Sequence, residues 1–114
     1  ASRFRSGFEG KVALGLKDLG VTFSFEPYKI SFVQPAKQRS YTPDFVLPNG
    51  VIIEVKGRFE TADRQKHLMI RETHGTPEEG GPDIRFLFQA PHQRISKRSK
   101  TTYAMWCDKH GFRF

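Results

Sequence analysis

The stretch YTPDFVLPNGVIIEVKG, residues 41–57, determines the expected fold of this chain. Its second half, residues 51–56, is mostly β-branched and apolar, which is typical of a buried strand. Residues 44–47 predict a preceding strand, and the Pro-Asn-Gly sequence at 48–50 is typical of a turn. The segment therefore predicts a β-hairpin in which Gly50 takes a left-handed conformation.

The length of the turn decides which side chains face each other across this hairpin. A three-residue loop pairs Leu47 with Val51 and, further along, Asp44 with Glu54. The Cβ atoms of such opposed residues lie roughly 4.5–5.5 Å apart. A two-residue Asn-Gly turn would instead oppose Asp44 to Val55, so the register is a prediction that a structure can test.

Alternation along the second strand brings its charged side chains together. Glu54 and Lys56 are two residues apart, so they share a face with the opposed carboxylate of Asp44. The other face is apolar and consists of Phe45, Leu47, Val51, Ile53 and Val55. Half-buried carboxylates need a compensating cation, and Mg²⁺ binds through one or two carboxylates. The hairpin therefore predicts a metal site; an edge hairpin with a surface Glu–Lys pair is the alternative, and it would need four features to coincide by chance.

This pattern resembles the signature of the PD-(D/E)XK nuclease superfamily, which hydrolyses phosphodiesters with divalent metal. Further segments in the same order are similar to the phage endonuclease I family, the Holliday-junction resolvases of short-tailed phages. These segments are FRSGFEGKV (4–12), residues 41–57, DRQKHLMIRETH (63–74), DIRFLF (83–88) and TTYAMWCDKHGFRF (101–114). The resemblance covers nearly the whole chain and includes segments that no metal site requires.

The resemblance implies a catalytic set of Glu9, Asp44, Glu54 and Lys56, all four of which are intact. It implies Mg²⁺ as cofactor, with Mn²⁺ as a substitute and two ions per active site. As a hypothesis, Asp44 bridges the two metals, Glu54 and the Val55 carbonyl bind one, and Glu9 binds the other. Lys56 would orient the attacking water and offset developing charge, because lysine stays a cation unless strongly desolvated.

The resemblance also implies an intertwined, domain-swapped homodimer that cuts branched double-stranded DNA with paired nicks, leaving 5′-phosphate and 3′-hydroxyl ends. Residues 34–40, which are polar and contain a proline, would be the crossing arm. Glu9 of one chain would then join the hairpin residues of its partner. Two departures from the family are expected: a longer loop at 74–83 and a missing or trimmed C-terminal tail, which leaves tail contacts with DNA open.

Two alternatives of different kinds remain beside junction resolution. One is another PD-(D/E)XK endonuclease that cuts linear duplex DNA, and the other is a non-catalytic DNA-binding module of the same fold. Glu9 also has a structural alternative, because Ser6-Gly7-Phe8-Glu9 fits a capping box in which the glutamate bonds back to the Ser6 amide.

The length, net charge and cysteine content of the chain limit these interpretations. Its 114 residues predict a single domain, 1–114, which the resemblance implies is a nuclease domain. Its net charge of +7 favours a polyanionic partner. No apolar run is long enough to span a membrane. Cys107 is the single cysteine and excludes an internal disulfide, which fits a reducing cytoplasm. The resemblance implies that this is the cytoplasm of an infected bacterial host cell.

Periodicity and turn residues predict an α/β sandwich around a mixed β-sheet. The resemblance implies that this is the restriction-endonuclease-like α/β fold, a mixed β-sheet flanked by helices. Helices are expected at 3–19, at 61–73 with Thr61 as N-cap, and from Thr101 or Thr102 to His110; strands are expected at 21–33, broken at Pro27, at the hairpin, and at 84–88. Basic side chains on the second helix and in the loop 90–100 could contact DNA. The expected DNA contacts are Arg58, Arg64, Lys66, His67, Arg71, Arg94, Lys97, Arg98 and Lys100.

Overall fold

The structure is a computed structural model that describes residues 4–34 and 37–114. Its elements in chain order are α1 (Gly7–Asp18), β1 (Ser24–Phe25), β2 (Ile30–Gln34), β3 (Lys37–Tyr41), β4 (Phe45–Val46), β5 (Ile52–Lys56), α2 (Thr61–His74), the 3₁₀ helix η1 (Pro77–Glu79), β6 (Ile84–Phe88) and α3 (Tyr103–His110).

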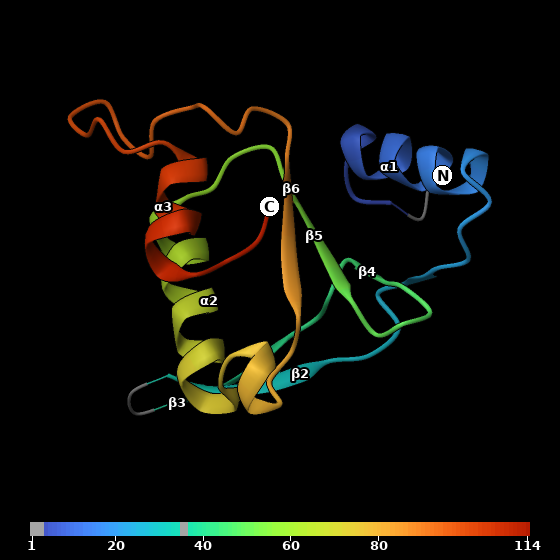
Figure 1. Ribbon diagram of the computed structural model, residues 1–114, viewed down its shortest axis with the longest axis horizontal. Coiled ribbons are helices and arrows are strands. Elements are labelled where there is room, and N and C mark those ends of the chain that lie inside the picture. Colours follow the sequence, from blue (N-terminus) through green and yellow to red (C-terminus); the bar gives the residue numbers. More distant parts are fainter. Residues whose placement is uncertain (1–3, 35–36) are drawn as a thin grey trace.

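The central sheet has the strand order β1-β4-β5-β6. The first two pairings are antiparallel, whereas β5 and β6 run parallel, with α2 connecting them. Helix α1 lies on one side of this sheet, and α2 and α3 lie on the other (Figure 1). This arrangement confirms the predicted α/β sandwich around a mixed sheet.

Two apolar clusters hold the three layers together. The smaller cluster joins α1 to the sheet through Ala13, Phe45 and Val55. The larger one joins the opposite face to α2 and α3, and its buried members are Phe32, Tyr41, Ile52, Phe59, Ile70, Ile84, Phe86, Phe88, Tyr103, Trp106, Cys107 and Phe112. Since Ile52 and Val55 belong to different clusters, β5 is packed on both faces, as its nearly continuous apolar sequence predicts.

The hairpin has the register expected from a three-residue loop. Phe45 pairs with Ile53 and Val46 with Ile52. At the turn, the Leu47 amide donates to the Val51 carbonyl at 2.9 Å. Gly50 has a φ of 87°, so the left-handed conformation is confirmed. The same register places Asp44 opposite Glu54.

Two helix starts differ from the prediction by a few residues. Helix α1 begins at Gly7 with Ser6 as N-cap, while the expected start at residue 3 lies outside the described residues. The N-cap of α2 is Glu60 rather than Thr61, because the Glu60 amide donates to Asp63 Oδ2 at 3.1 Å. The C-terminal helix agrees with the prediction: Thr102 caps α3, and Gly111 ends it at a φ of 73°.

The expected crossing arm at 34–40 contains a regular strand. Lys37–Tyr41 pairs antiparallel with Ile30–Gln34 of the same chain, and residues 35–36 lie outside the described part. Residues 38–40 are exposed, so burial imposes no alternating apolar pattern there and the sequence reads as a polar linker. Exchange of this segment between subunits stays a prediction.

The remaining connections follow the expected pattern. The segment after α2 contains only the short η1, and β6 occupies the predicted 84–88. The basic segment 90–100 is a loop tied down by an isolated bridge between Arg94 and Thr102. Within residues 4–34 and 37–114, none of the helices has the length and apolar character needed to cross a bilayer.

Candidate active site

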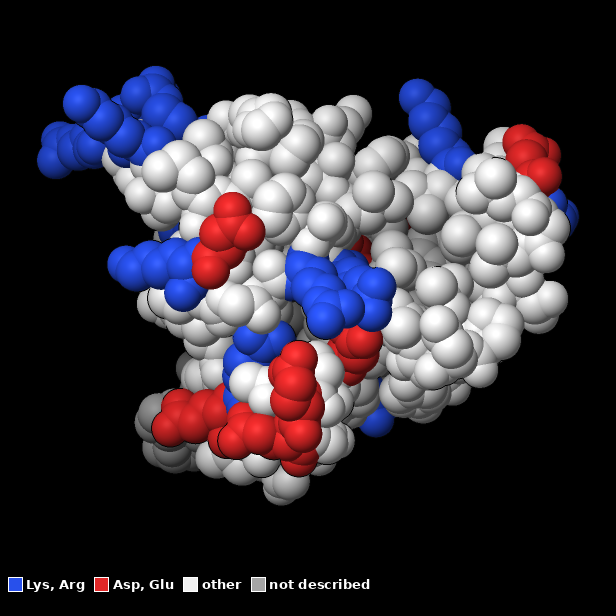
Figure 2. All heavy atoms as spheres, viewed as in Figure 1, with Lys and Arg blue, Asp and Glu red and all other residues white. Residues whose placement is uncertain are grey.

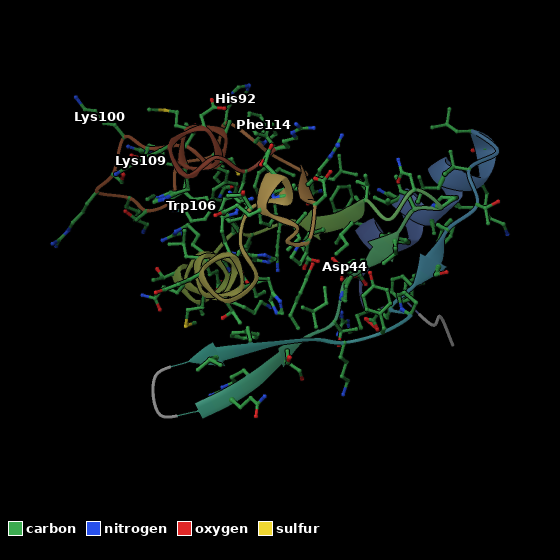
Figure 3. The ribbon with its side chains drawn as sticks, turned by 60° about the horizontal axis from the view of Figure 1, so that its bottom comes forward. Asp44, His92, Lys100, Trp106, Lys109 and Phe114 are labelled. Atoms are coloured by element: carbon green, nitrogen blue, oxygen red, sulfur yellow. The ribbon has the colours of Figure 1, made fainter. Side chains whose placement is uncertain are left out.

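Two opposed carboxylates form the centre of the candidate site. Asp44 and Glu54 are 4% and 3% exposed and lie across the hairpin from each other. Asp44 Oδ2 accepts a hydrogen bond of 2.9 Å from the Val55 amide, which links the end of one strand to the next. Figure 3 shows the Asp44 side chain at the centre of the molecule. The register thus brings the two acids together as the sequence predicts.

Burial and mutual repulsion make these acids hard to ionise. The pKa of Asp44 is raised to about 7, first by burial and then by the negative charges of Glu54 and Glu9. Burial also raises the pKa of Glu54, while the nearby Lys56 opposes that shift. A bound cation would relieve both costs, since it compensates the two negative charges.

Glu9 reaches this region from the first turn of α1. It is buried, and its negative charge contributes to the raised pKa of Asp44. The Ser6 hydroxyl caps the helix by accepting from the Glu9 amide at 3.1 Å. The Glu9 carboxylate accepts from the Arg5 amide at 3.0 Å, not from the Ser6 amide as a capping box would require. Glu9 therefore supports the helix start and lies near the carboxylate pair of its own chain.

Lys56 lies between a site acid and a second acid from α2. Its Nζ is 3.7 Å from Glu54 Oε2 and 3.1 Å from Asp63 Oδ1. Its side chain is 15% exposed, so the ammonium group is enclosed but still reachable. The predicted neighbourhood of Asp44, Glu54 and Lys56 is therefore present.

Three neighbours of the site were not among the predicted residues. The Tyr41 hydroxyl donates to Glu54 Oε1 at 2.5 Å, and Asp63 accepts from Lys56. The guanidinium of Arg5 lies 3.5 Å from Asp44 Oδ1 and 2.6 Å from Glu26 Oε1. Tyr41 stands at the start of the quoted stretch, and an acid in the first turn of the following helix was a signal for Asp63; nothing local pointed to Arg5.

A hard metal fits part of this arrangement. In the part of the chain that is described, no three His, Cys, Asp or Glu side chains together form a metal-binding group. The Arg5 amide donates to one Glu9 oxygen and the Tyr41 hydroxyl to one Glu54 oxygen, so each acid has one oxygen bonded within the protein. The donor set that fits is the buried pair, because Mg²⁺ needs only one or two protein carboxylates.

The Val55 carbonyl lies on the side of β5 where it could be a ligand of the same ion. The N–H and C=O groups of one strand residue leave the strand on the same side. The Val55 amide bonds Asp44, so the carbonyl leaves β5 on the Asp44 side. The neighbouring residue Lys56 uses its carbonyl to accept from the Gln89 amide at the β6 side.

The basic residues predicted to contact DNA fall into three groups: buried, hydrogen-bonded within the protein, and exposed. His67 is 0% exposed and packs edge-to-face against Tyr41 and Phe86, so it does not fit the predicted role of contacting DNA. The physical reason is that its helix position faces the core rather than solvent. Burial and nearby positive charges also lower the pKa of His67 well below its ordinary value.

Two of the arginines predicted to contact DNA donate hydrogen bonds to main-chain carbonyls of the protein itself. Arg71 donates to the carbonyls of His110 and Gly111 at 3.0 and 2.8 Å and stacks on Phe112, which joins α2 to the end of α3. Arg64 donates to the Phe59 carbonyl at 2.5 Å at the start of α2.

The other residues predicted to contact DNA are more accessible to it. Lys66 is half-buried, with its ammonium over the Tyr41 ring. The exposed members are Arg58, Arg94, Lys97, Arg98 and Lys100. Figure 2 shows Lys and Arg side chains gathered over the loop that precedes α3.

Known proteins match this chain over nearly its whole length. The profile of the family described as phage endonuclease I matches residues 1–114. The chain is 47% identical over 111 residues to Endonuclease I of Escherichia phage T7, covering 97% of this chain and 71% of the relative. It is also 47% identical over 111 residues to Endodeoxyribonuclease 1 of Enterobacteria phage T3, covering 97% and 70%. The chain therefore belongs to the phage endonuclease I family.

Proposed function

We propose that this protein is a metal-dependent endodeoxyribonuclease of the PD-(D/E)XK type that resolves four-way and other branched DNA junctions by paired nicks. The observation that supports this most is the buried Asp44–Glu54 pair with Lys56 beside it. The two phage relatives, named as an endonuclease and an endodeoxyribonuclease, support DNA as the substrate. The products would have 5′-phosphate and 3′-hydroxyl ends.

The proposed cofactor is Mg²⁺, with Mn²⁺ as a substitute and two ions per site. Asp44, Glu54 and the Val55 carbonyl would hold one ion, and Asp44 with Glu9 would hold the other. When bound, the metal would supply Lewis-acid polarisation of the phosphate and lower the pKa of water. The raised pKa of Asp44 supports a cation here, because ionising this buried pair without one is unfavourable.

Lys56 would act on the reacting phosphate. Its ammonium has three donors, and in the described structure carboxylates lie at two sides of it. A remaining donor could orient the attacking water and offset negative charge that develops on the phosphate oxygens. The enclosed position strengthens such an interaction, since water screens it less than at the surface.

The DNA backbone would lie along the exposed basic residues. Arg58 follows the strand that ends in Lys56, so a phosphate held there would be near the proposed site. The loop residues Arg94, Lys97, Arg98 and Lys100 would extend the contact. His67 is left out of this set because it is buried.

We further propose the intertwined homodimer, which would act in the cytoplasm of the infected host. Two sites at a fixed angle would suit the arms of a four-way junction and would be out of register with a straight duplex. Exchange through residues 34–40 would give each site its Glu9 from the partner. In the single chain Glu9 lies near its own Asp44, so an exchange of identical halves would preserve these contacts.

The test compares an end-labelled four-way junction with matched linear duplex, each with Mg²⁺. Selective paired nicks near the branch point are the expected result. Equal cutting of both substrates would support the linear-duplex alternative, and binding of both without any cutting would support the non-catalytic module.

A further inference from the structure

Two side chains from outside the hairpin hold the charged groups of the site. Tyr41 is the last residue of β3, which precedes the hairpin, and Asp63 lies in the first turn of α2, which follows it. Neither belongs to the proposed metal-binding and catalytic set. Each bonds one different member of that set, Glu54 or Lys56.

Tyr41 fixes one oxygen of Glu54. Its hydroxyl donates to Glu54 Oε1 at 2.5 Å, and the two residues are 2% and 3% exposed, so little water can compete. The ring itself is held by an edge-to-face contact with His67 at 5.1 Å and by the ammonium of Lys66 at 5.6 Å. With Oε1 occupied in this way, Glu54 presents Oε2 toward Lys56.

Asp63 fixes the ammonium of Lys56. Its Oδ1 accepts from Lys56 Nζ at 3.1 Å, and its Oδ2 accepts from the Glu60 amide at 3.1 Å. Both oxygens are therefore used, and the carboxylate cannot rotate freely. The distance from Lys56 Nζ to Glu54 Oε2 is 3.7 Å, which exceeds an ordinary hydrogen bond.

We propose that Tyr41 and Asp63 are positioning residues that keep Glu54 and Lys56 apart, so that Glu54 Oε2 stays available to the metal. Without them, the flexible lysine would close onto Glu54 as a hydrogen-bonded ion pair, because such pairs are favoured in enclosed surroundings. That pair would occupy the metal ligand and withdraw the ammonium from the phosphate. This inference rests on the proposed function.

The first test measures metal affinity in the absence of DNA. Mn²⁺ is titrated calorimetrically into Tyr41→Phe and Asp63→Asn, with Tyr103→Phe and Glu79→Gln as controls. Tyr103 is a second buried tyrosine, and Glu79 is a second helix-start acid, which accepts from the Thr76 amide at 2.9 Å. Both test variants should lose on the order of 10- to 100-fold in affinity, and both controls should match wild type.

The second test separates positioning from a structural role. Single-turnover cleavage of saturating junction is measured for Asp63→Asn, Lys56→Ala and the double variant. If Asp63 acts through Lys56, Asp63→Asn slows wild type but has little further effect once Lys56 is removed. If the rate losses of the two single variants multiply in the double variant, Asp63 does not act through Lys56 and its proposed role is overturned. Circular dichroism and thermal melts check that each variant folds.

The outcomes distinguish this inference from the proposed function. Wild-type metal binding and cleavage, with Tyr41→Phe and Asp63→Asn unchanged in both, would overturn the positioning role alone. Wild-type protein that neither binds Mn²⁺ nor cuts the junction would overturn the proposed function and the positioning role with it.

Discussion

The Val55 amide donates a 2.9 Å hydrogen bond to Asp44 Oδ2, so the central acid of the site is bonded to the main chain of the neighbouring strand. The opposed Glu54 is one residue away on that strand. The position of one acid relative to the other therefore depends on the hairpin register. A one-residue slip would turn Glu54 to the opposite face of the sheet and dismantle the site.

Replacing Lys56 by alanine should greatly slow cleavage but leave junction binding nearly unchanged. Removing a charge-stabilising donor typically costs on the order of 10²–10³ in rate, while one lysine beside many basic contacts adds little to affinity. Single-turnover cleavage and gel-shift binding on the same junction measure the two effects. Lys109→Ala, an exposed lysine on α3, is the control. Cleavage at the wild-type rate would remove Lys56 from the chemistry.

The metal-free protein should lose stability as pH rises through the range in which Asp44 ionises. Its pKa is about 7 in the fold against 3.8 ordinarily, because burial, Glu54 and Glu9 disfavour the charge. The stabilising contribution is thus complete below about pH 4 and lost as pH passes about 7, on the order of a few kcal/mol. In EDTA, this contribution should lower the melting temperature of wild type relative to Asp44→Asn by several degrees between about pH 5 and about pH 8.

Asp44→Asn is the control for that pH effect. His67 acts oppositely, because its lowered pKa removes stability as pH falls below its ordinary value of 6.5. His67 is present in both proteins, so its effect cancels when the two melting profiles are subtracted. The melting temperature of Asp44→Asn should rise relative to that of wild type as pH increases, and adding Mg²⁺ should reduce this difference. A pH-independent difference would contradict the raised pKa.

The hairpin was predictable from local signals. The Pro-Asn-Gly turn and the β-branched run after it predicted the two strands, and of the two possible loop lengths the structure has the three-residue one. Likewise, a threonine before an apolar segment and a following glycine predicted both ends of α3. Such features depend on residues close in sequence.

Other features depend on contacts that no local pattern reveals. His67 has helical spacing with Arg64 and Arg71, which suggested one basic face, yet the core around Phe86 buries it. Lys37–Tyr41 forms a strand because it pairs with β2, although its own composition is polar. The bonds from Tyr41 and Asp63 join three elements, so neither followed from the hairpin sequence alone.

Replacing His67 by leucine should stabilise the fold. In the described structure both ring nitrogens of His67 are buried without a hydrogen-bond partner, which costs about 1–3 kcal/mol. Leucine is similar in size and removes the polar atoms, so a gain of about 1 kcal/mol is expected after repacking. Urea unfolding at neutral pH measures it, with exposed His92→Leu as control. A loss of stability would show that the ring contacts of His67 with Tyr41 and Phe86 outweigh the cost of its unpaired nitrogens.

Neutralising the basic loop should weaken junction binding and its salt dependence. Arg94, Lys97, Arg98 and Lys100 are exposed, and the slope of log affinity against log salt should shrink by about 0.9 for each phosphate that is no longer neutralised. Glutamine substitutions at these positions are compared by binding titrations at several salt concentrations. Lys17→Gln, on the exposed side of α1, is the control. An unchanged slope would exclude this loop from the DNA interface.

Mixed dimers should reveal whether each site combines two chains. Glu9→Gln and Asp44→Asn are each expected to be inactive, so the two proteins are unfolded together and refolded. With exchange, one site of a mixed dimer recovers both native residues and nicks one strand, while the other site has both defects. Without exchange, every site retains one defect. If the refolded mixture nicks the junction and neither variant does so by itself, the composite site is supported. If the mixture is also inactive, the composite site is refuted.

The most direct test of the proposed metal centre is single-turnover cleavage of a four-way junction by wild type and Asp44→Asn, each with Mg²⁺ and with EDTA. Wild type should nick the junction only with Mg²⁺, whereas Asp44→Asn should bind the junction and leave it intact in both. Cleavage by wild type in EDTA, or by Asp44→Asn at the wild-type rate, would contradict a metal-dependent centre built on Asp44 and Glu54.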